Sequence, residues 1–273
     1  MVLILLFLLV PMAQTVWFSL FDWDGITLAT WAGIGNYLTV LTAGWFGEGL
    51  THVLALLVFY AALPISFALL LAATISRRRI RGNGVFQTFL FLPQVITPVV
   101  IGLAWGAMYA PQGVINQLLR LVGLDVLTRA WLGDFDLALI AVGLIGSWVS
   151  TGLCFVLFVA GISSIPGELY DAAKMDGAGA VREFFAVTLP GLRGQLAIAL
   201  TLTVIAAVRT FDLIYVLTRG GPGTSTSVPA FQIYNLAFNQ GQVGTGSAVA
   251  VILSALILVL TAAINRVAQQ EEE

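Results

Sequence analysis

Few side chains in this 273-residue chain are of a type and in a setting that could perform covalent chemistry. Cys154 is the one cysteine, and because it lies inside an apolar segment we expect it to pack rather than to react. His52 is the one histidine, and no cysteine or acidic cluster beside it suggests a metal site. Lys174 is the one lysine, and no phosphate-binding G-x-x-x-x-G-K-[ST] loop is present. The sequence therefore predicts neither an enzyme nor a metal or cofactor site.

The longest charged interruption of this apolar chain lies at residues 168–180. Ser164 is suited to cap a helix, and Pro166 to occupy its first turn. Glu168 would place negative charge near the positive end of the helix dipole. We expect this short helix to extend to about Met175.

The residues that follow predict a turn and a second short helix. Gly177 or Gly179 can adopt the left-handed conformation, which costs a residue with a Cβ roughly 1 kcal/mol or more. A helix over about 180–188 comes next, and we expect Pro190 to end it. The resulting helix–turn–helix presents the small side chains of Ala172 and Ala173 on a face that another protein could approach closely.

Arg209 and Asp212 are charges inside an apolar run long enough to span a bilayer. A buried charge there costs at least ~2.5 kcal/mol, so such groups usually line a water-filled path or pair with each other. At i and i+3 of one helix the two side chains share a face and can pair, and Tyr215 continues that face from Asp212. A structural ion pair and a position on a solute path both fit this pattern.

The elements that must position these residues are membrane-spanning helices. The chain is 59% hydrophobic and 10% charged, with a mean hydropathy of +0.97, whereas a soluble domain carries about 25% charged residues. This composition predicts an all-α integral membrane protein, and the net charge of −2 argues against nucleic-acid binding. Six segments are long enough to cross a ~30 Å hydrocarbon core. We expect a single domain over residues 1–273, with spans near 1–21, 53–75, 86–109, 137–162, 195–218 and 246–266 and a loop at 163–192.

Two of these spans have unusual features. The first has no basic leader and no A-x-A cleavage site, so we expect a retained span rather than a cleaved signal peptide. The third contains Leu92-Pro93-Gln94 and Thr97-Pro98, which predict kinks and make Gln94 a candidate to line a cavity.

The distribution of basic residues predicts the orientation in the membrane. Three arginines lie in the loops of one side, and eight basic residues lie on the other side. The three are Arg120, Arg129 and Arg219, and the eight are Arg77, Arg78, Arg79, Arg81, Lys174, Arg182, Arg193 and Arg266. The richer side is expected to be cytoplasmic, which places both termini and the 163–192 loop there. The opposite loops contain interfacial aromatics near Trp23 and an amphipathic run, Val114–Val122, which predicts a short interfacial helix.

The 163–192 loop closely resembles the EAA loop of permease subunits of binding-protein-dependent ABC importers. The pattern is Asp171-Ala172-Ala173, three residues, Gly177, nine residues, and Val187-Thr188-Leu189-Pro190. Asp171 stands where that family has Glu, and Val187 where it has Ile, so charge or shape is kept. In that family the loop is the cytoplasmic coupling helix, which inserts into the ATPase subunit. The resemblance implies ATPase-coupling roles for Glu168, Tyr170, Asp171, Ala172, Ala173, Asp176, Gly177, Leu189 and Pro190.

A second stretch resembles the fifth span and following loop of the carbohydrate-type permeases of that family. It runs from Phe211-Asp212-Leu213-Ile214-Tyr215 to Thr218 and continues with Gly220-Gly221-Pro222-Gly223. The resemblance, over about residues 30–266, implies a type I ABC importer permease in a bacterial or archaeal cell membrane. The implied partners are a second permease subunit, two cytoplasmic ATPases that bind ATP and Mg²⁺, an extracytoplasmic solute-binding protein and a sugar. The implied mechanism is alternating access, driven by the ATPases through the 163–192 loop.

Other functions would leave different traces in the sequence. A glycerol-phosphate or other polar-solute permease would share the fold, but a phosphate cargo favours a positive cavity, and Arg209 stands beside Asp212. An ion-coupled secondary transporter would predict inverted repeats and more intramembrane acids, and a non-transporting scaffold would leave the docking loop without a role. Sugars favour stacking on aromatic rings and hydrogen bonds to planar polar groups. Such groups are offered by Trp105, Tyr109, Trp148, Gln94 and Tyr215. The substrate-path candidates are Gln94, Trp105, Trp148, Arg209, Asp212 and Tyr215.

Overall fold

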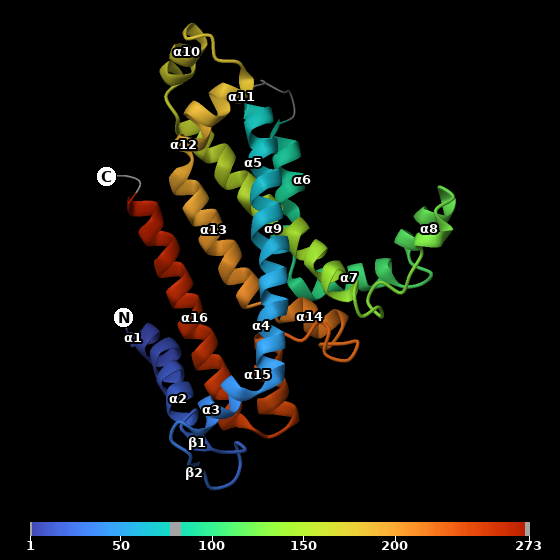
Figure 1. Ribbon diagram of the computed structural model, residues 1–273, viewed down its shortest axis with the longest axis vertical. Coiled ribbons are helices and arrows are strands. Elements are labelled where there is room, and N and C mark those ends of the chain that lie inside the picture. The colour runs from blue at the N-terminus through green and yellow to red at the C-terminus, as the bar shows by residue number, and fades with distance from the viewer. Residues whose placement is uncertain (1, 77–82, 271–273) are drawn as a thin grey trace. The chain divides into compact units, whose positions relative to one another are not determined.

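The computed structural model describes residues 2–76 and 83–270, and these are helical almost throughout, as the composition predicts (Figure 1). One short antiparallel strand pair, β1 (Phe21–Asp22) with β2 (Thr30–Trp31), accompanies the helices. Four of the eight basic residues behind the predicted orientation lie outside the described residues: Arg77, Arg78, Arg79 and Arg81.

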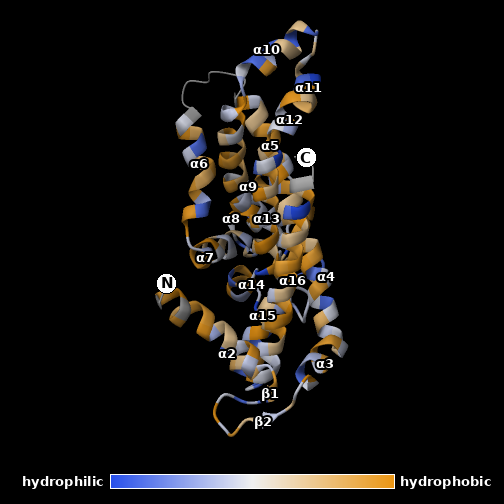
Figure 2. Ribbon diagram, turned by 90° about the vertical axis from the view of Figure 1, so that its left-hand side faces the viewer, coloured by the Kyte–Doolittle hydropathy of each residue, from blue (hydrophilic) through white to orange (hydrophobic). Residues whose placement is uncertain are grey.

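Five helices in the described part of the chain are long and apolar enough to cross a membrane. Counted across short breaks within two of them, they are Gly44–Ile75, Pro98–Leu121, Ala138–Ser164, Arg193–Leu217 and Val243–Ala268. Two shorter apolar helices, Leu6–Phe18 and Gly84–Val95, occupy the predicted first span and the first half of the predicted third. Figure 2 shows hydrophobic residues along most of α16 and a mixture of hydrophobic and hydrophilic residues in α10. The multi-pass architecture is thus clear, and the count of six spans stays a prediction.

Proline explains where the predicted third span is divided. The helix α6 contains Pro93 and ends at Val95, and α7 begins at Pro98. A residue that precedes proline is disfavoured in the helical region, so Thr97, before Pro98, is a natural place for the break. The kink predicted there is therefore a full interruption of the helix.

The chain forms two compact units that interleave in sequence. The first comprises Met1–Ala55, Gly102–Ala141 and Val208–Val259, and the second comprises Leu56–Ile101, Val142–Ala207 and Leu260–Glu273. Up to residue 95 the helices are α1 (Val2–Ile4), η1 (Leu5–Leu9), α2 (Val10–Phe18), α3 (Gly35–Thr42), α4 (Gly44–Leu57), η2 (Val58–Ala62), α5 (Leu63–Ser76) and α6 (Asn83–Val95). The next are α7 (Pro98–Tyr109), α8 (Val114–Leu121), η3 (Asp125–Leu127), α9 (Ala138–Ser164), α10 (Gly167–Met175), α11 (Ala180–Glu183), η4 (Phe184–Thr188) and α12 (Leu189–Gly191). The last are α13 (Arg193–Val208), α14 (Asp212–Leu217), α15 (Pro229–Tyr234), η5 (Asn235–Asn239) and α16 (Val243–Gln270).

A buried asparagine ties the first unit together. The Asn36 amide donates to the backbone carbonyl oxygens of Ser19, at 2.9 Å, and Phe21, at 2.8 Å. Its side-chain oxygen accepts a 3.1 Å hydrogen bond from the Thr245 hydroxyl. A buried polar group must be hydrogen-bonded to avoid a large desolvation cost, so these bonds hold α2, α3 and α16 in one arrangement. The apolar core beside them consists of Val40, Phe46, Leu236, Ala248 and Val249.

The second unit is built around α9. Its buried core consists of Ala68, Ala72, Cys154, Phe155, Phe158, Leu192 and Ala199. Cys154 is a free, buried cysteine, which confirms the prediction that it packs. At Gly152 a Cβ would overlap the carbonyl oxygen of Leu90, so the backbones of α9 and α6 meet directly. Small residues that allow such close approach are typical of helix contacts in membranes.

Candidate functional site

The first arm of the charged loop is α10, and it starts without the predicted side-chain cap. Ser164 is the last residue of α9, and its hydroxyl donates back to the Gly161 carbonyl at 2.7 Å. Pro166 occupies the N-cap position and makes no side-chain hydrogen bond. Glu168 in the first turn and Lys174 in the last complement the helix dipole, so electrostatics rather than capping favours this helix.

The turn after α10 is the predicted left-handed exit, and Gly177 makes it with φ = 74°. The Gly177 amide donates to the Lys174 carbonyl at 3.0 Å, and the Ala178 amide donates to the Ala173 carbonyl at 2.9 Å. These two bonds are those of a Schellman motif, in which glycine is preferred because it has no Cβ. Gly177 therefore fixes the direction in which the chain returns.

The return arm differs from the prediction at Pro190. The chain is helical through α11, η4 and α12 as far as Gly191, so Pro190 does not end the helix at residue 188. Pro190 lies in the last turn of this continuous helical arm, which extends one residue past it, to Gly191. The Tyr170 hydroxyl lies 3.2 Å from the hydroxyl of the buried Thr188, so a direct hydrogen bond connects the two arms.

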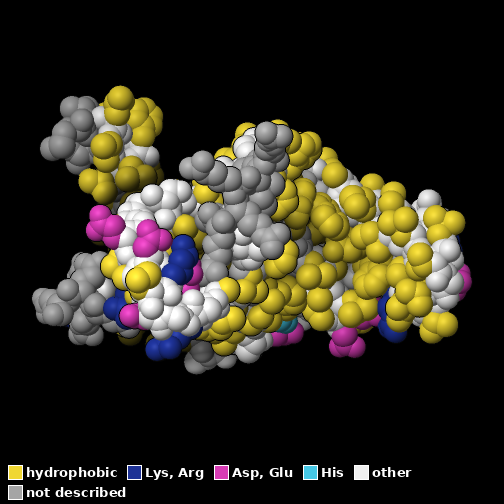
Figure 3. Space-filling view, turned by 90° about the horizontal axis from the view of Figure 1, so that it is seen from above, with side chains coloured by type: hydrophobic (Ala, Val, Ile, Leu, Met, Phe, Trp, Pro, Cys, Tyr) yellow, Lys and Arg dark blue, Asp and Glu magenta, His cyan; other side chains and the backbone are white. Residues whose placement is uncertain are grey.

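The loop exposes charged and apolar side chains side by side (Figure 3). Asp171 forms an exposed ion pair with Lys174 at 3.4 Å, and Glu168 and Asp176 are also exposed. The exposed large apolar side chains are Leu169, Met175, Val181 and Phe185, and Met175 is 89% exposed. Ala172 is exposed, whereas Ala173, like Leu189, is half-buried. Such a mixture of small, charged and apolar exposed groups favours a protein-docking surface.

Glu183 is a loop residue that the sequence analysis did not single out. It lies in α11 and is 6% exposed, whereas Glu168 is exposed. Nothing in the residues beside Glu183 distinguishes it from an exposed glutamate, because its burial depends on the fold of the return arm.

The predicted pair of membrane charges does not lie on one continuous helix. The α13 helix ends at Val208 and α14 begins at Asp212, so residues 209–211 interrupt the fifth span. Arg209 and Asp212 are both exposed, and the described part of the chain shows no ion pair between them. The i, i+3 pairing predicted for an unbroken helix is therefore wrong. The two charges thus lie at either end of a helix break and not along one face of a continuous helix.

The remaining path candidates are divided between the two units. Tyr215, in the first unit, stacks on Phe211 with ring centroids 5.3 Å apart. Trp105, in the same unit, contacts Tyr109 at 5.4 Å. Gln94 and Trp148 belong to the second unit, and both are exposed.

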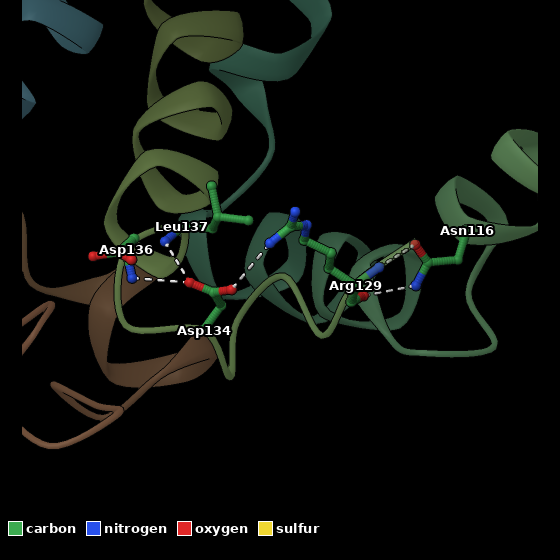
Figure 4. Close-up of polar contacts among 5 residues, drawn as sticks. All are labelled: Asn116, Arg129, Asp134, Asp136 and Leu137. Carbon is green, nitrogen blue, oxygen red and sulfur yellow. Dashed lines mark hydrogen bonds and ion pairs between the residues drawn. The ribbon is translucent and has the colours of Figure 1, made fainter. Parts of the chain in front are cut away.

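Asn116 organises the loop that connects α7 to α9, a role that the sequence analysis missed. Its side chain is 1% exposed. Its oxygen accepts from the Arg129 amide at 3.2 Å and from the Trp131 indole at 2.9 Å, and its amide donates to the Arg129 carbonyl at 2.8 Å (Figure 4). Asp134 accepts from the amides of Asp136 and Leu137 and lies 3.9 Å from the Arg129 guanidinium. The predicted amphipathic run is confirmed as α8, and Asn116 holds it in place.

The single histidine has a structural contact. His52 Nδ1 lies 2.6 Å from the Ser227 carbonyl oxygen. Within residues 2–76 and 83–270, no three His, Cys, Asp or Glu side chains come together as a metal site would require.

In the loop between β1 and β2, the Asp24 carboxylate accepts hydrogen bonds from the backbone amides of Thr27, at 2.7 Å, and Ile26, at 2.8 Å. These bonds stabilise the charged carboxylate and lower the pKa of Asp24.

Comparison with known proteins decides the family. Residues 65–271 match the model of the binding-protein-dependent transport system inner membrane component. The chain belongs to this family. A probable ABC transporter permease of Bacillus subtilis is 36% identical over 94% of this chain and 89% of that protein. A trehalose/maltose transport system permease of Thermococcus litoralis is 35% identical over 94% of this chain and 87% of its own length.

A solved structure supports the fold. In the crystal structure of a bacterial ABC transporter that imports alginate, one chain matches with a TM-score of 0.83, 23% sequence identity and coverage of 98% of this chain and 92% of that chain. The chain is thus a multi-pass membrane permease component with the fold of an ABC importer permease, and a component of this kind is not itself catalytic.

Proposed function

We propose that this permease is one of two membrane subunits of an ABC importer and forms half of the translocation path for a sugar. The observation that carries the proposal is the helix–turn–helix at residues 165–192, whose EAA-like residues include the exposed Asp171 and Ala172 and the turn at Gly177. The sugar is inferred from relatives such as the trehalose/maltose permease and from the aromatic and polar residues around Arg209 and Asp212.

The proposed importer includes partners that bind ATP and that deliver the sugar. Two cytoplasmic ATPases would bind ATP and Mg²⁺, because this chain has no phosphate-binding loop. An extracytoplasmic solute-binding protein would deliver the sugar to the opposite side.

Alternating access needs a rigid lever between ATPase and spans. Closure of the ATPase dimer would move α10, and the Schellman turn at Gly177 and the Tyr170–Thr188 contact would transmit this movement through the return arm to α13. The sugar path would then open outward, and ATP hydrolysis would reverse the change. The chain itself performs no covalent step.

Two glycines of the loop provide a matched test of the lever. Gly177 has a positive φ and Gly179 a negative one, and a Cβ at either position would have no heavy atom within 4 Å. Gly177→Val should therefore strain the turn by ~1–2 kcal/mol, while Gly179→Val should not. We expect reconstituted Gly177→Val complexes to lose sugar uptake, and Gly179→Val complexes to keep most of it. Equal uptake by parent and Gly177→Val would contradict a lever role for this turn.

Cross-linking tests the docking itself. In a Cys154→Ser background, a cysteine at the exposed Ala172 should form a disulfide with a cysteine in the ATPase groove, and a cysteine at the outer-loop position Leu28 should not. The same complexes should hydrolyse ATP in response to loaded binding protein, whereas the isolated permease should not hydrolyse it. Uptake of a labelled sugar panel that includes glycerol 3-phosphate would identify the cargo class, and uptake of glycerol 3-phosphate alone would overturn sugar as the cargo.

A further inference from the structure

Four aromatic rings form a continuous ladder in the first unit, defined here as Phe211, Tyr215, Tyr234 and Phe238. Phe211 lies 5.3 Å from Tyr215 and 5.5 Å from Tyr234, measured between ring centroids. Tyr215 and Tyr234 are 5.1 Å apart and their hydroxyl oxygens lie 3.4 Å from each other. Phe238 extends the ladder from Tyr234 at 5.3 Å. The ladder thus joins the break in the fifth span to the helix formed by α15 and η5.

A row of amide side chains runs along that same helix, defined here as Gln232, Asn235 and Asn239. Asn239 donates to the Asn235 side-chain oxygen at 3.0 Å, and Asn235 lies 3.5 Å from the Gln232 oxygen. Gln232 in turn donates to the Ser227 hydroxyl at 2.7 Å. Each amide offers both donors and acceptors, so the row keeps hydrogen-bonding capacity beyond these contacts.

Burial separates the ladder from the hydrophobic core. The helix is anchored by Phe231 and Leu236, which are 8% and 5% exposed. The rings of Phe211, Tyr215 and Tyr234 are only half-buried, and Phe238 is 76% exposed. Residues 235–239 also form a π-helical turn, a geometry found often at functional sites. The rings are therefore accessible to a ligand in this chain.

We propose that the aromatic ladder and the amide row form a sugar-binding track at the mouth of the translocation path; this inference rests on the proposed sugar-importer function. A sugar ring has an apolar C–H face, which can stack on an aromatic ring, and a rim of hydroxyl groups, which amides can bind. Arg209, two residues before Phe211 in the sequence, and Asp212, directly after it, are exposed, so charged groups adjoin the ladder at the helix break.

Membrane anchoring and protein docking are two further roles that exposed aromatic rings can have, and each differs from sugar binding in its consequences. Rings that merely anchor the helix in the membrane interface would need no polar row beside them. If the rings instead formed a docking surface for the binding protein, removal of one ring would weaken protein docking and would not affect the transfer of sugar itself.

The test uses the complete importer in proteoliposomes with saturating binding protein, and measures labelled sugar uptake and ATP hydrolysis together. Phe238→Ala and Asn239→Ala should each lower the amount of sugar moved per ATP hydrolysed by about fivefold, as expected when a stacking or hydrogen-bonding contact worth ~1 kcal/mol is lost. Phe238→Tyr, which keeps the ring, should retain the parent ratio. Phe135→Ala removes another exposed phenyl ring of the same unit and should leave the ratio unchanged.

The outcomes separate this inference from the function on which it rests. The parent complex could transport sugar while the Phe238→Ala and Asn239→Ala variants move as much sugar per ATP hydrolysed as the parent does. That result would overturn the track and leave the importer function intact. Lower stimulation of ATP hydrolysis by binding protein at an unchanged ratio would point to protein docking and also overturn the track. A parent complex that transports no sugar would overturn both.

Discussion

At the scale of single residues, Asn116 has the clearest structural role. Its side chain makes five hydrogen bonds, to backbone groups of Ala110, Pro111 and Arg129 and to the Trp131 indole. Asn116→Ala would remove them and leave several partners unsatisfied, so we expect a loss of about 2–3 kcal/mol in local stability. Limited proteolysis of the 121–129 segment measures this loss.

The neighbouring Gln117→Ala is the matched control for Asn116→Ala. Gln117 is exposed and makes one hydrogen bond, to the Gln112 carbonyl at 2.7 Å. Exposed substitutions of this kind change stability by about 0.5 kcal/mol or less. Equal proteolysis of the two variants would show that Asn116 does not hold the loop.

The helix break at residues 209–211 changes what is expected of Arg209 and Asp212. In an unbroken helix, Arg209→Ala would strand a buried Asp212 and impair folding. Because both side chains are exposed, Arg209→Ala/Asp212→Ala should assemble normally. If these charges contact the solute, uptake at matched membrane expression should fall about tenfold or more, since hydrogen bonds to charged groups contribute ~1.5–3 kcal/mol each. Arg120→Ala, on α8, is the control, and normal uptake by the double variant would remove both residues from the path.

The residues that could be predicted from the sequence are those with local causes. A left-handed turn at Gly177 or Gly179 was predicted because such a turn after a short helix selects glycine, and the structure places it at Gly177. Asn116 could not be found this way, because its partners at 129 and 131 are distant in sequence and four of its five bonds are to backbone groups. The Arg209–Asp212 pairing was wrong because it assumed regular helix geometry where the chain interrupts it.

At the scale of elements, α9 depends on glycine where it meets α6. A Cβ at Gly152 would overlap the backbone carbonyl of Leu90, and backbone cannot move aside as a flexible side chain can. We expect Gly152→Ala to destabilise the permease by about 1–3 kcal/mol or more, through overpacking. Thermal unfolding in detergent and the yield of folded protein measure the effect.

Gly194 provides the matching control on another helix. It lies in α13, and a Cβ there would have no heavy atom within 4 Å. Gly194→Ala should therefore leave the yield unchanged and raise stability by about 0.5–1 kcal/mol, because alanine loses less backbone entropy than glycine on folding. If Gly152→Ala behaved in the same way, the close contact of α9 with α6 would be disproved.

Hydrophobicity alone was enough to locate most of the long helices. The predicted span near 137–162 coincides with α9 to within two residues at each end, and the span near 246–266 lies within α16, because each is a long apolar run without proline. Helix ends were harder to predict. The helix of the predicted second span begins at Gly44 rather than near residue 53, and Phe46 in its first turn packs with Val40 and Leu236 in the core of the first unit. Hydropathy reports suitability for lipid and does not report such packing.

At the scale of the whole molecule, the distribution of basic residues predicts which side faces the cytoplasm. The predicted topology places eight basic residues on the side of the 163–192 loop and three on the other, and an asymmetry of this kind sets the orientation during insertion. Leu28, 95% exposed after β1, should then be extracytoplasmic, and Val181, 72% exposed in α11, should be cytoplasmic. In a Cys154→Ser background without ATPase partners, a membrane-impermeant maleimide should label Leu28→Cys in intact cells and Val181→Cys only after permeabilisation. The parent Cys154→Ser protein should remain unlabelled in both conditions. The reverse pattern would invert the orientation and leave the helix–turn–helix facing the binding protein instead of the ATPases.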